Sequence, residues 1–182
     1  MSTKLETWAR NAAFQYVERF ATSEANLRSV LERKVRTRKM QGQIPEDVDP
    51  TDAISGAISF LVENGLINDA SFAEMKTRSG KGKGKSRSRI TQELVIKGVN
   101  KDLAVKSVSD VDDLHQAIRH AQRKRIGPFR TSNLDEKTKR REYGSFARAG
   151  FPPSVFLKVF DMEQQEAEDL LFHREKDELT LR

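Results

Sequence analysis

Two segments of this chain follow one pattern, and their likeness constrains the fold more than any other feature. They read LVIKGVNKDLAVKSV (94–108) and FARAGFPPSVFLKVF (146–160), and they align without a gap at an offset of 52 residues. In each segment a helical pattern stops at a glycine, Gly98 or Gly150, and a short helical pattern begins soon after it. A unit used more than once predicts a repeat protein, although any two helical hairpins would share part of this likeness.

Apolar residues recur with helical spacing, at i, i+3 and i+4, along most of the chain, whereas the alternation typical of strands is almost absent. We therefore predict an all-α protein with nine helices before a final acidic tail. Serine, aspartate and asparagine supply the expected N-caps, and glycines supply several of the expected ends. The predicted helices are Glu6–Ala21, one capped by Ser23, one from Asp49 and Pro50 to Gly65, one capped by Asp69 that dissolves at the glycines of 80–84, one from Ser86 or Ser88 to Gly98, one capped by Asn100, one across Leu114–Ala121, one that stops at Gly150 and one from Pro153.

The nine helices fall into groups of three. This grouping predicts an elongated, curved array of tandem three-helix repeats, whose concave face is a natural binding surface. The predicted parts are a first repeat at 1–67, a second at 68–110, a third at 111–161 and an acidic helical tail at 162–182. A charged fraction of 33% beside a hydrophobic fraction of 36% also favours a thin shape over one thick core.

Charge is distributed unevenly along the chain. The net charge of +6 combines +11 over residues 1–160 with −5 over residues 161–182. A body this basic is typical of proteins that meet a polyanion, either nucleic acid or an acidic protein surface. The acidic end is either an ordinary solvated helix or a segment that competes with the partner for the basic face.

Several classes of protein are disfavoured by the sequence. No stretch approaches the roughly 20 apolar residues of a membrane span, and MSTKLETWAR lacks the apolar core of a signal peptide. We therefore expect a cytoplasmic protein without a membrane partner. The absence of cysteine removes disulfides, thiolate nucleophiles and cysteine-ligated metals.

The stretch SGKGKGKSRSR (79–89) contains half of a phosphate-binding loop. Gly-Lys-Ser stands at 84–86, but Ser79 occupies a position that needs glycine, and the preceding segment has a helical pattern where that loop follows a strand. His115 and His120 lie five residues apart, so they cannot share a metal as an i, i+4 pair does, and both are expected at the surface. We predict no catalytic residue, no metal site and no cofactor.

Positive charge on a helical scaffold is what remains. Besides the run at 76–89, three others read RKVRTRK (33–39), RHAQRKR (119–125) and KTKRR (137–141). Any one run is typical of a solvated face, but four of them predict a continuous basic stripe. No aromatic platform for stacked bases interleaves these runs, and no helix has the pattern of a base-reading recognition helix, which argues against sequence-specific DNA binding.

Four segments of the chain carry a family resemblance. They read YVERFATSEANL (16–27), ISFLVENGLINDASFA (58–73), GKSRSRITQELVIKGV (84–99) and KRREYGSFARAGF (139–151). Together, in this order, they resemble the RecX family of bacterial recombinase regulators, most specifically in G-L-I-N-D-x-x-F-A and G-K-S-x-x-R-I-x-x-E-L-x-x-K-G. The second predicted helix, the QGQIPEDVD that follows it and the tail after Met162 depart from the family pattern.

The resemblance implies tandem three-helix repeats that act on the RecA recombinase. A protein of this family lies along the groove of the RecA–DNA filament, inhibits its ATPase, filament extension and strand exchange, and takes part in DNA repair, recombination and the SOS response. On this basis we expect the RecA filament as partner, weak binding to single- and double-stranded DNA, a monomer and no enzymatic activity.

We expect basic side chains to supply the contacts with the filament, while glycines 80, 82 and 84 let the backbone adapt to the groove as the segment becomes ordered on binding. The alternative is a non-specific nucleic-acid-binding protein that acts without a filament partner, for which tight and salt-sensitive binding to bare DNA is expected. The predicted contact residues are Lys81, Lys83, Lys85, Arg87, Arg89, Lys97, Arg119, Arg123, Lys124, Arg125, Arg140 and Arg141.

Overall fold

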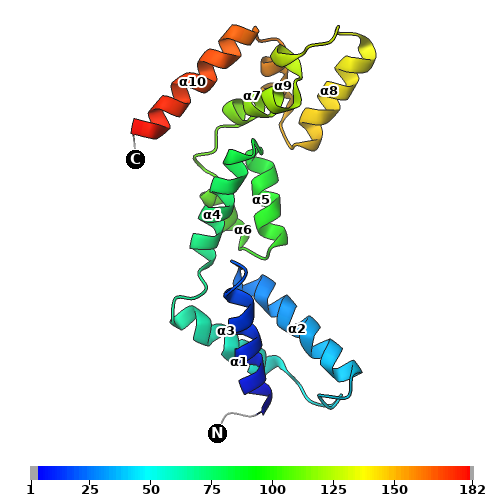
Figure 1. The fold of residues 1–182 in the computed structure, drawn as a ribbon, viewed down its shortest axis with the longest axis vertical. Helices are drawn as coiled ribbons and strands as arrows, with labels where there is room; N and C mark the ends of the chain where they lie inside the picture. The colour runs from blue at the N-terminus through cyan, green and yellow to red at the C-terminus, as the bar shows by residue number, and fades with distance from the viewer. Residues whose placement is uncertain (1–3, 181–182) are drawn as a thin grey trace. The chain divides into compact units, whose positions relative to one another are not determined.

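The computed structural model describes residues 4–180, and the side chains of residues 4–173. Within this range the chain forms ten α-helices and one short 3-10 helix and contains no strand, so the all-α prediction is confirmed (Figure 1). The elongated, curved arrangement of three repeats stays a prediction. The last helix, α10 (Gln164–Thr180), falls in the predicted acidic tail, where the side chains from residue 174 onward lie outside the described residues.

The chain divides into two compact units. Unit 1 comprises residues 1–75 and 94–104, and unit 2 comprises residues 76–93 and 105–182. Three helices fall within the predicted second repeat, and each of them begins in one unit and ends in the other. These helices are α4 (Asp69–Gly82), α5 (Arg87–Ile96) and α6 (Lys101–Ser107).

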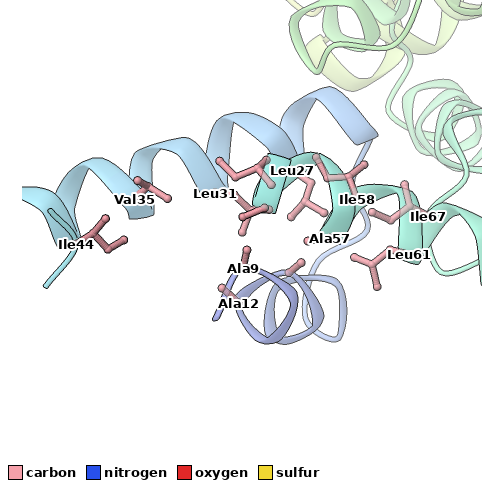
Figure 2. Packing of buried hydrophobic residues seen from close by; sticks show 13 residues of the cluster. Ala9, Ala12, Leu27, Leu31, Val35, Ile44, Ala57, Ile58, Leu61 and Ile67 are labelled. Carbon is pink, nitrogen blue, oxygen red and sulfur yellow. The ribbon is translucent and has the colours of Figure 1, made fainter. Parts of the chain in front are cut away.

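Unit 1 is built on three N-terminal helices around one apolar core. α1 packs chiefly against α3, and its buried residues Ala9, Ala12 and Ala13 are small enough to let the two helices approach closely. Figure 2 shows the core residues of α2, among them Leu27 and Leu31, directed at α1 and α3. The helices are α1 (Lys4–Val17), α2 (Glu24–Met40) and α3 (Thr51–Glu63).

Unit 2 contains a second apolar core, rich in aromatic rings. Phe146 is fully buried and stacks on Phe156 with ring centroids 5.7 Å apart, and Tyr143 meets Phe160 edge-on at 4.8 Å. Leu171 of α10 packs into the same cluster. The remaining elements of this unit are α7 (Asp113–Lys124), the 3-10 helix η1 (Gly127–Phe129), α8 (Glu136–Arg148) and α9 (Pro153–Phe160).

Ser23 joins two helices of unit 1. Its hydroxyl oxygen accepts a hydrogen bond from the Asn26 N–H at 3.1 Å, so the prediction that Ser23 caps α2 is confirmed. The same hydroxyl donates to the carbonyl of Lys97, the residue before Gly98. Gly98 has a φ of +79°, and a Cβ placed there would lie 2.4 Å from the Cβ of Ala25, so glycine is required at this joint.

Ser86 forms the equivalent joint in unit 2. Its hydroxyl oxygen accepts from the Arg89 N–H at 3.1 Å and so caps α5, and the hydroxyl donates to the carbonyl of Ala149 at 2.8 Å. Gly150 follows Ala149 with a φ of +83°, and a Cβ there would lie 2.6 Å from the Ser86 oxygen. The two joints therefore explain why Gly98 and Gly150 occupy the same place in the internal repeat.

The predicted end of the first helix is wrong. α1 ends at Val17 rather than Ala21, because Phe20 is 55% exposed and offers no buried face for another turn. On α5, Val95 is 44% exposed, whereas its neighbour Leu94 is only 1% exposed. Adjacent residues point about 100° apart around a helix, so burial of one does not bring the next inward.

α4 begins and ends differently from the prediction. Its cap is Asn68, whose side-chain oxygen accepts a hydrogen bond from a first-turn N–H at 3.0 Å, and Asp69 is instead the first helical residue. The helix continues through Gly80 to Gly82. Gly80 lies on the buried face, where an added Cβ would come within 2.7 Å of the Ile90 side chain, so this glycine permits close packing inside a helix rather than ending it.

His115 and His120 are buried, which contradicts their predicted place at the surface. Each is only 5% exposed. Nε2 of His120 lies 3.0 Å from Oγ of Ser145, and the ring lies beside Phe146 and Phe151 with centroids 5.5 and 5.7 Å away. α7 packs against α9, α10 and η1. These neighbours cover more than one face of α7, so both histidines are buried although they lie on different sides of the helix.

Candidate polyanion-binding surface

The basic stretch at 79–89 forms the end of α4, a tight turn and the start of α5. The Lys85 N–H donates to the Gly80 carbonyl at 3.1 Å, and Gly84 is buried with a φ of +63°. The expectation of a segment that becomes ordered only on binding is therefore wrong, because the turn is held by hydrogen bonds within the chain.

The turn lies against α7 within unit 2. A Cβ placed on Gly84 would be 3.3 Å from the backbone N of His120 and 3.5 Å from Cβ of Arg119. The guanidinium of Arg123 donates to the carbonyl of Lys83. The structure therefore brings the predicted contact residues of the 79–89 stretch together with those of α7.

Two of these cations share one carboxylate. Nζ of Lys85 lies 2.6 Å from Oε2 of Glu93, and Nε of Arg89 lies 3.1 Å from Oε1 of the same residue. Burial raises the pKa of Glu93, but the hydrogen bonds and charges of Lys85 and Arg89 outweigh burial and hold that pKa below its usual value. Lys85 and Arg89 are thus partly neutralised by the chain itself.

Two further cations are bound within unit 2. The Arg87 guanidinium donates to the carbonyl of Val111 at 2.6 Å. Lys81 forms an ion pair with Asp110 at 3.0 Å, and its side chain is 25% exposed. A polyanion would have to compete with these internal acceptors.

The remaining predicted contact residues are solvent-facing to different degrees. Lys83 on the turn and Lys124 at the end of α7 have exposed side chains, and Arg125 is exposed with a φ of +52°. Arg119 is half-buried. Arg140 and Arg141 are exposed on α8. Lys97, the residue directly after α5, is also exposed but belongs to unit 1.

The structure reveals a buried ion pair that the sequence did not single out. Glu142 is fully buried, and its carboxylate accepts hydrogen bonds from the Arg130 guanidinium at 3.0 and 2.7 Å and from the Gly127 N–H at 2.9 Å. Glu142 lies one helical turn before the buried Phe146, and residues four apart share a helix face. This spacing was the signal in the sequence from which the burial of Glu142 could have been predicted. The pair ties η1 and the following loop to α8.

Aromatic rings lie beside one of the basic runs in the structure, although none interleaves it in the sequence. Trp8 and Tyr16 of α1 line hollows together with Lys34 and other residues of the 33–39 run on α2. The two rings precede this run by about twenty residues in the sequence. Only the packing of α1 beside α2 brings them to it.

The described residues also lack two other features, a cluster of metal ligands and a membrane-spanning helix. In the described part of the chain, no group of three or more His, Cys, Asp or Glu side chains could hold a metal ion. No helix among the described residues is both long enough and apolar enough to cross a bilayer.

Comparison with known proteins identifies the family. The sequence model of the family described as "RecX, second three-helix domain" matches residues 68–106. A protein of Agrobacterium fabrum named "Regulatory protein RecX" is 33% identical over 173 residues, which cover 93% of this chain and 91% of the relative. The chain belongs to the RecX family. A "Regulatory protein RecX" of Myxococcus xanthus is 36% identical over 161 residues, or 85% of each chain.

Solved RecX structures have the same fold. "Crystal structure of regulatory protein RecX" matches with a TM-score of 0.66 over 87% of this chain and 72% of that chain, at 15% identity. "Crystal structure of RecX from Lactobacillus salivarius" matches with a TM-score of 0.64 over 90% and 97% of the two chains, at 18% identity. The family resemblance read from the four sequence segments is therefore confirmed.

Proposed function

We propose that this RecX-family chain is a negative regulator of the RecA recombinase. In this role it binds in the groove of the RecA–DNA filament in the cytoplasm and inhibits the ATPase, filament extension and strand exchange, without a catalytic site or cofactor of its own. The observation that carries the proposal is the match to relatives named "Regulatory protein RecX" over nearly the whole chain.

The surface that we assign to filament contact is the basic face of unit 2. The turn after α4 and the C-terminal half of α7 lie together there, and their exposed cations include Lys83 and Lys124. Positive charge of this kind suits an acidic protein surface or a phosphate backbone. Lys81, Lys85, Arg87 and Arg89 have internal acceptors, so we assign them mainly to the shape of the surface.

Inhibition of DNA-dependent ATP hydrolysis by RecA tests this assignment. The variant Lys83→Ala/Lys124→Ala removes two exposed charges, and Lys101→Ala/Lys106→Ala removes two exposed charges from α6 as the matched control. Surface ion pairs contribute about 0.2–1 kcal/mol each, so the first variant should need about 2- to 30-fold more protein for half-inhibition. Equal inhibition by the two variants would refute the assigned surface.

The alternative function, nucleic-acid binding without a filament partner, makes a different prediction. It requires tight binding to bare DNA that falls steeply with salt, and binding that RecA and ATP do not improve. The proposed regulator should bind the RecA–DNA filament more tightly than it binds bare single-stranded or bare double-stranded DNA. Measuring both affinities at two salt concentrations separates the two functions.

A further inference from the structure

Unit 1 contains two hollows that share a wall. The first encloses about 600 Å³ between α1 and the C-terminal half of α2, and the second encloses about 450 Å³ along the middle of α2. Lys34 and Thr37 line both. In Figure 1 the two helices lie close together near the start of α2 and diverge toward its end.

Regular helical faces build the walls of the first hollow. Its α1 residues are 8, 11, 12 and 15, and α2 with its C-cap contributes 34, 37, 38 and 41. Each set follows the i, i+3, i+4, i+7 spacing of one helical face. Small and polar residues dominate both faces, so the helices do not close on each other with an apolar seam. The space is a property of the fold and not of one side-chain position.

The first hollow combines a flat ring, a guanidinium and amide groups. The Arg38 guanidinium lies over the Trp8 ring, 4.8 Å from its centroid, and both groups are half-buried. Asn and Gln side chains offer both donors and acceptors, which suits the edge of any base. The amide residues that line this hollow are Asn11, Gln15, Gln41 and Gln43.

The second hollow adds positive charge and another ring. Arg33, Lys34 and Lys97 line it together with Tyr16, and the lining residues of the two hollows include no Asp or Glu. An acidic peptide would match the cations but would leave the ring, the guanidinium plane and the amides unused. Phosphates for the cations and flat, hydrogen-bonding bases for the rings and amides occur together in single-stranded nucleic acid.

We propose that these two hollows form a binding site for single-stranded nucleic acid, with an unstacked base in the first hollow and phosphates in the second. A base stacks on the guanidinium plane of Arg38, which lies over the Trp8 ring, while the amides bind its polar edge without strong sequence preference. The site belongs to unit 1, whereas the surface assigned above to the filament belongs to unit 2, and it needs no RecA. A duplex keeps its bases stacked and paired, so it should bind more weakly.

The chain supplies its own reporter for this site, since Trp8 is its only tryptophan. Titrating the full chain with an oligothymidylate of about 15 nucleotides should quench Trp8 fluorescence. Four cations line the two hollows, and each phosphate contact on a single strand contributes about −0.7 to the slope of log affinity against log salt, so the slope should be about −2 to −3. Binding without a change in Trp8 fluorescence would overturn the proposal.

A matched pair of variants locates the phosphates. Lys34→Ala removes the cation shared by both hollows and should reduce the salt slope by about 0.7, whereas Arg36→Ala, on the same helix but outside both hollows, should leave it unchanged. Equal effects of the two variants would overturn the site. Both positions are exposed, so circular dichroism should show unchanged folding.

Two further ligands distinguish a strand from its parts. Thymidine monophosphate and inorganic polyphosphate should each bind at least tenfold more weakly than the oligonucleotide, because neither joins a base to several phosphates. Equal binding of either one would contradict a strand site. All these titrations omit RecA, so their failure would leave the filament proposal intact, and failure of the ATPase test would leave this one intact.

Discussion

The Asp113 carboxylate accepts a hydrogen bond from the backbone N–H of Arg87 at 2.6 Å. Asp69 accepts one from the backbone N–H of Glu24 in the same way, at 2.9 Å. Each aspartate is the first residue of a helix, and each N–H belongs to the residue directly after a joint serine. Each joint thus holds three helices together. The second joint repeats the first, with each helix replaced by the helix that comes three later in the chain.

This advance gives the internal repeat a physical basis. The first joint holds the start of α2, the start of α4 and the end of α5, and the second holds the start of α5, the start of α7 and the end of α8. A serine hydroxyl, an aspartate and a left-handed glycine recur at matching places. The period of three helices therefore follows from a repeated set of hydrogen bonds as well as from similar apolar faces.

Alanine at the joint glycines should destabilise the protein. In Gly98→Ala and Gly150→Ala the backbone keeps its left-handed φ, and the new Cβ meets atoms at 2.4 and 2.6 Å. Left-handed strain of about 1–2 kcal/mol and overpacking of about 1–3 kcal/mol together predict a loss of about 2–5 kcal/mol in the free energy of unfolding. Urea-induced unfolding followed by circular dichroism measures it.

Two other glycines serve as controls for the joint. Gly65 has a φ of +69° but nothing within 4 Å of an added Cβ, so Gly65→Ala should cost only the strain of about 1–2 kcal/mol. Gly56 lies inside α3 and also has nothing within 4 Å of an added Cβ. The variant Gly56→Ala should therefore raise the free energy of unfolding by roughly 0.5–1 kcal/mol. If alanine at Gly98 or Gly150 lowered the free energy of unfolding no more than alanine at Gly65, the close contacts of the added Cβ would not constrain the joints.

The capping serine of the second joint should also contribute to stability. Ser86→Ala removes the cap of α5 and the hydrogen bond to the carbonyl of Ala149, so a loss of about 1–2 kcal/mol in unfolding free energy is expected. Ser88→Ala, two residues later and exposed, should stay within about 0.5 kcal/mol of the original chain. Similar melting temperatures for the two variants would contradict the joint.

Much of the fold could be predicted because it depends on local patterns. The stripe Leu27, Leu31, Val35 follows helical spacing, and caps such as Ser23 have a recognisable residue type. Gly80 misled the prediction because glycine inside a helix and glycine after a helix look alike in sequence. What separates them is the side chain of Ile90, a tertiary neighbour.

The candidate surfaces could be predicted only in part. Charge identified the cations of 79–89 and α7, but not that Glu93 would bind Lys85 and Arg89, since several acids lie within reach along the chain. Nor could spacing show that Trp8 lies beside Arg38, because this contact depends on the angle between two helices. Local patterns predict elements, whereas sites between elements require their packing.

Loss of the buried carboxylate of Glu142 should be costly. Glu142→Gln leaves the Arg130 guanidinium, whose side chain is only 16% exposed, without the opposite charge, and breaking such a pair costs up to roughly 3–5 kcal/mol. The hydrogen bond to Glu142 raises the pKa of Arg130 in the original chain. An arginine keeps its charge even without such a partner, so the variant cannot escape this cost by losing a proton. Glu136→Gln, exposed in the first turn of α8, should cost under about 1 kcal/mol in the same urea titration.

Acid should weaken the protein through His120 before it protonates most carboxylates. Burial, followed by the charges of Arg123 and Lys124, lowers the pKa of His120 from 6.5 to about 4. Because the folded-state pKa is the lower one, the neutral ring stabilises the fold fully above pH 6.5, and this contribution is lost as pH falls from 6.5 toward 4. The total loss should be at most roughly 3 kcal/mol, because solvent near the ring screens part of the charge.

The variant His120→Gln isolates this contribution, since the amide can still bond to Ser145 but does not titrate. The described neighbours of the ring are Ser145, Phe146 and Phe151, with the cations Arg123 and Lys124 nearby, and none of them is an acid that could compensate a charged imidazole. Unfolding free energies measured between pH 6.5 and 4.5 should fall in the original chain and stay nearly flat in the variant. Parallel curves for the two proteins over this window would mean that another group carries the pH dependence, and an NMR titration of His120 would then have its midpoint near 6.5 instead of about 4.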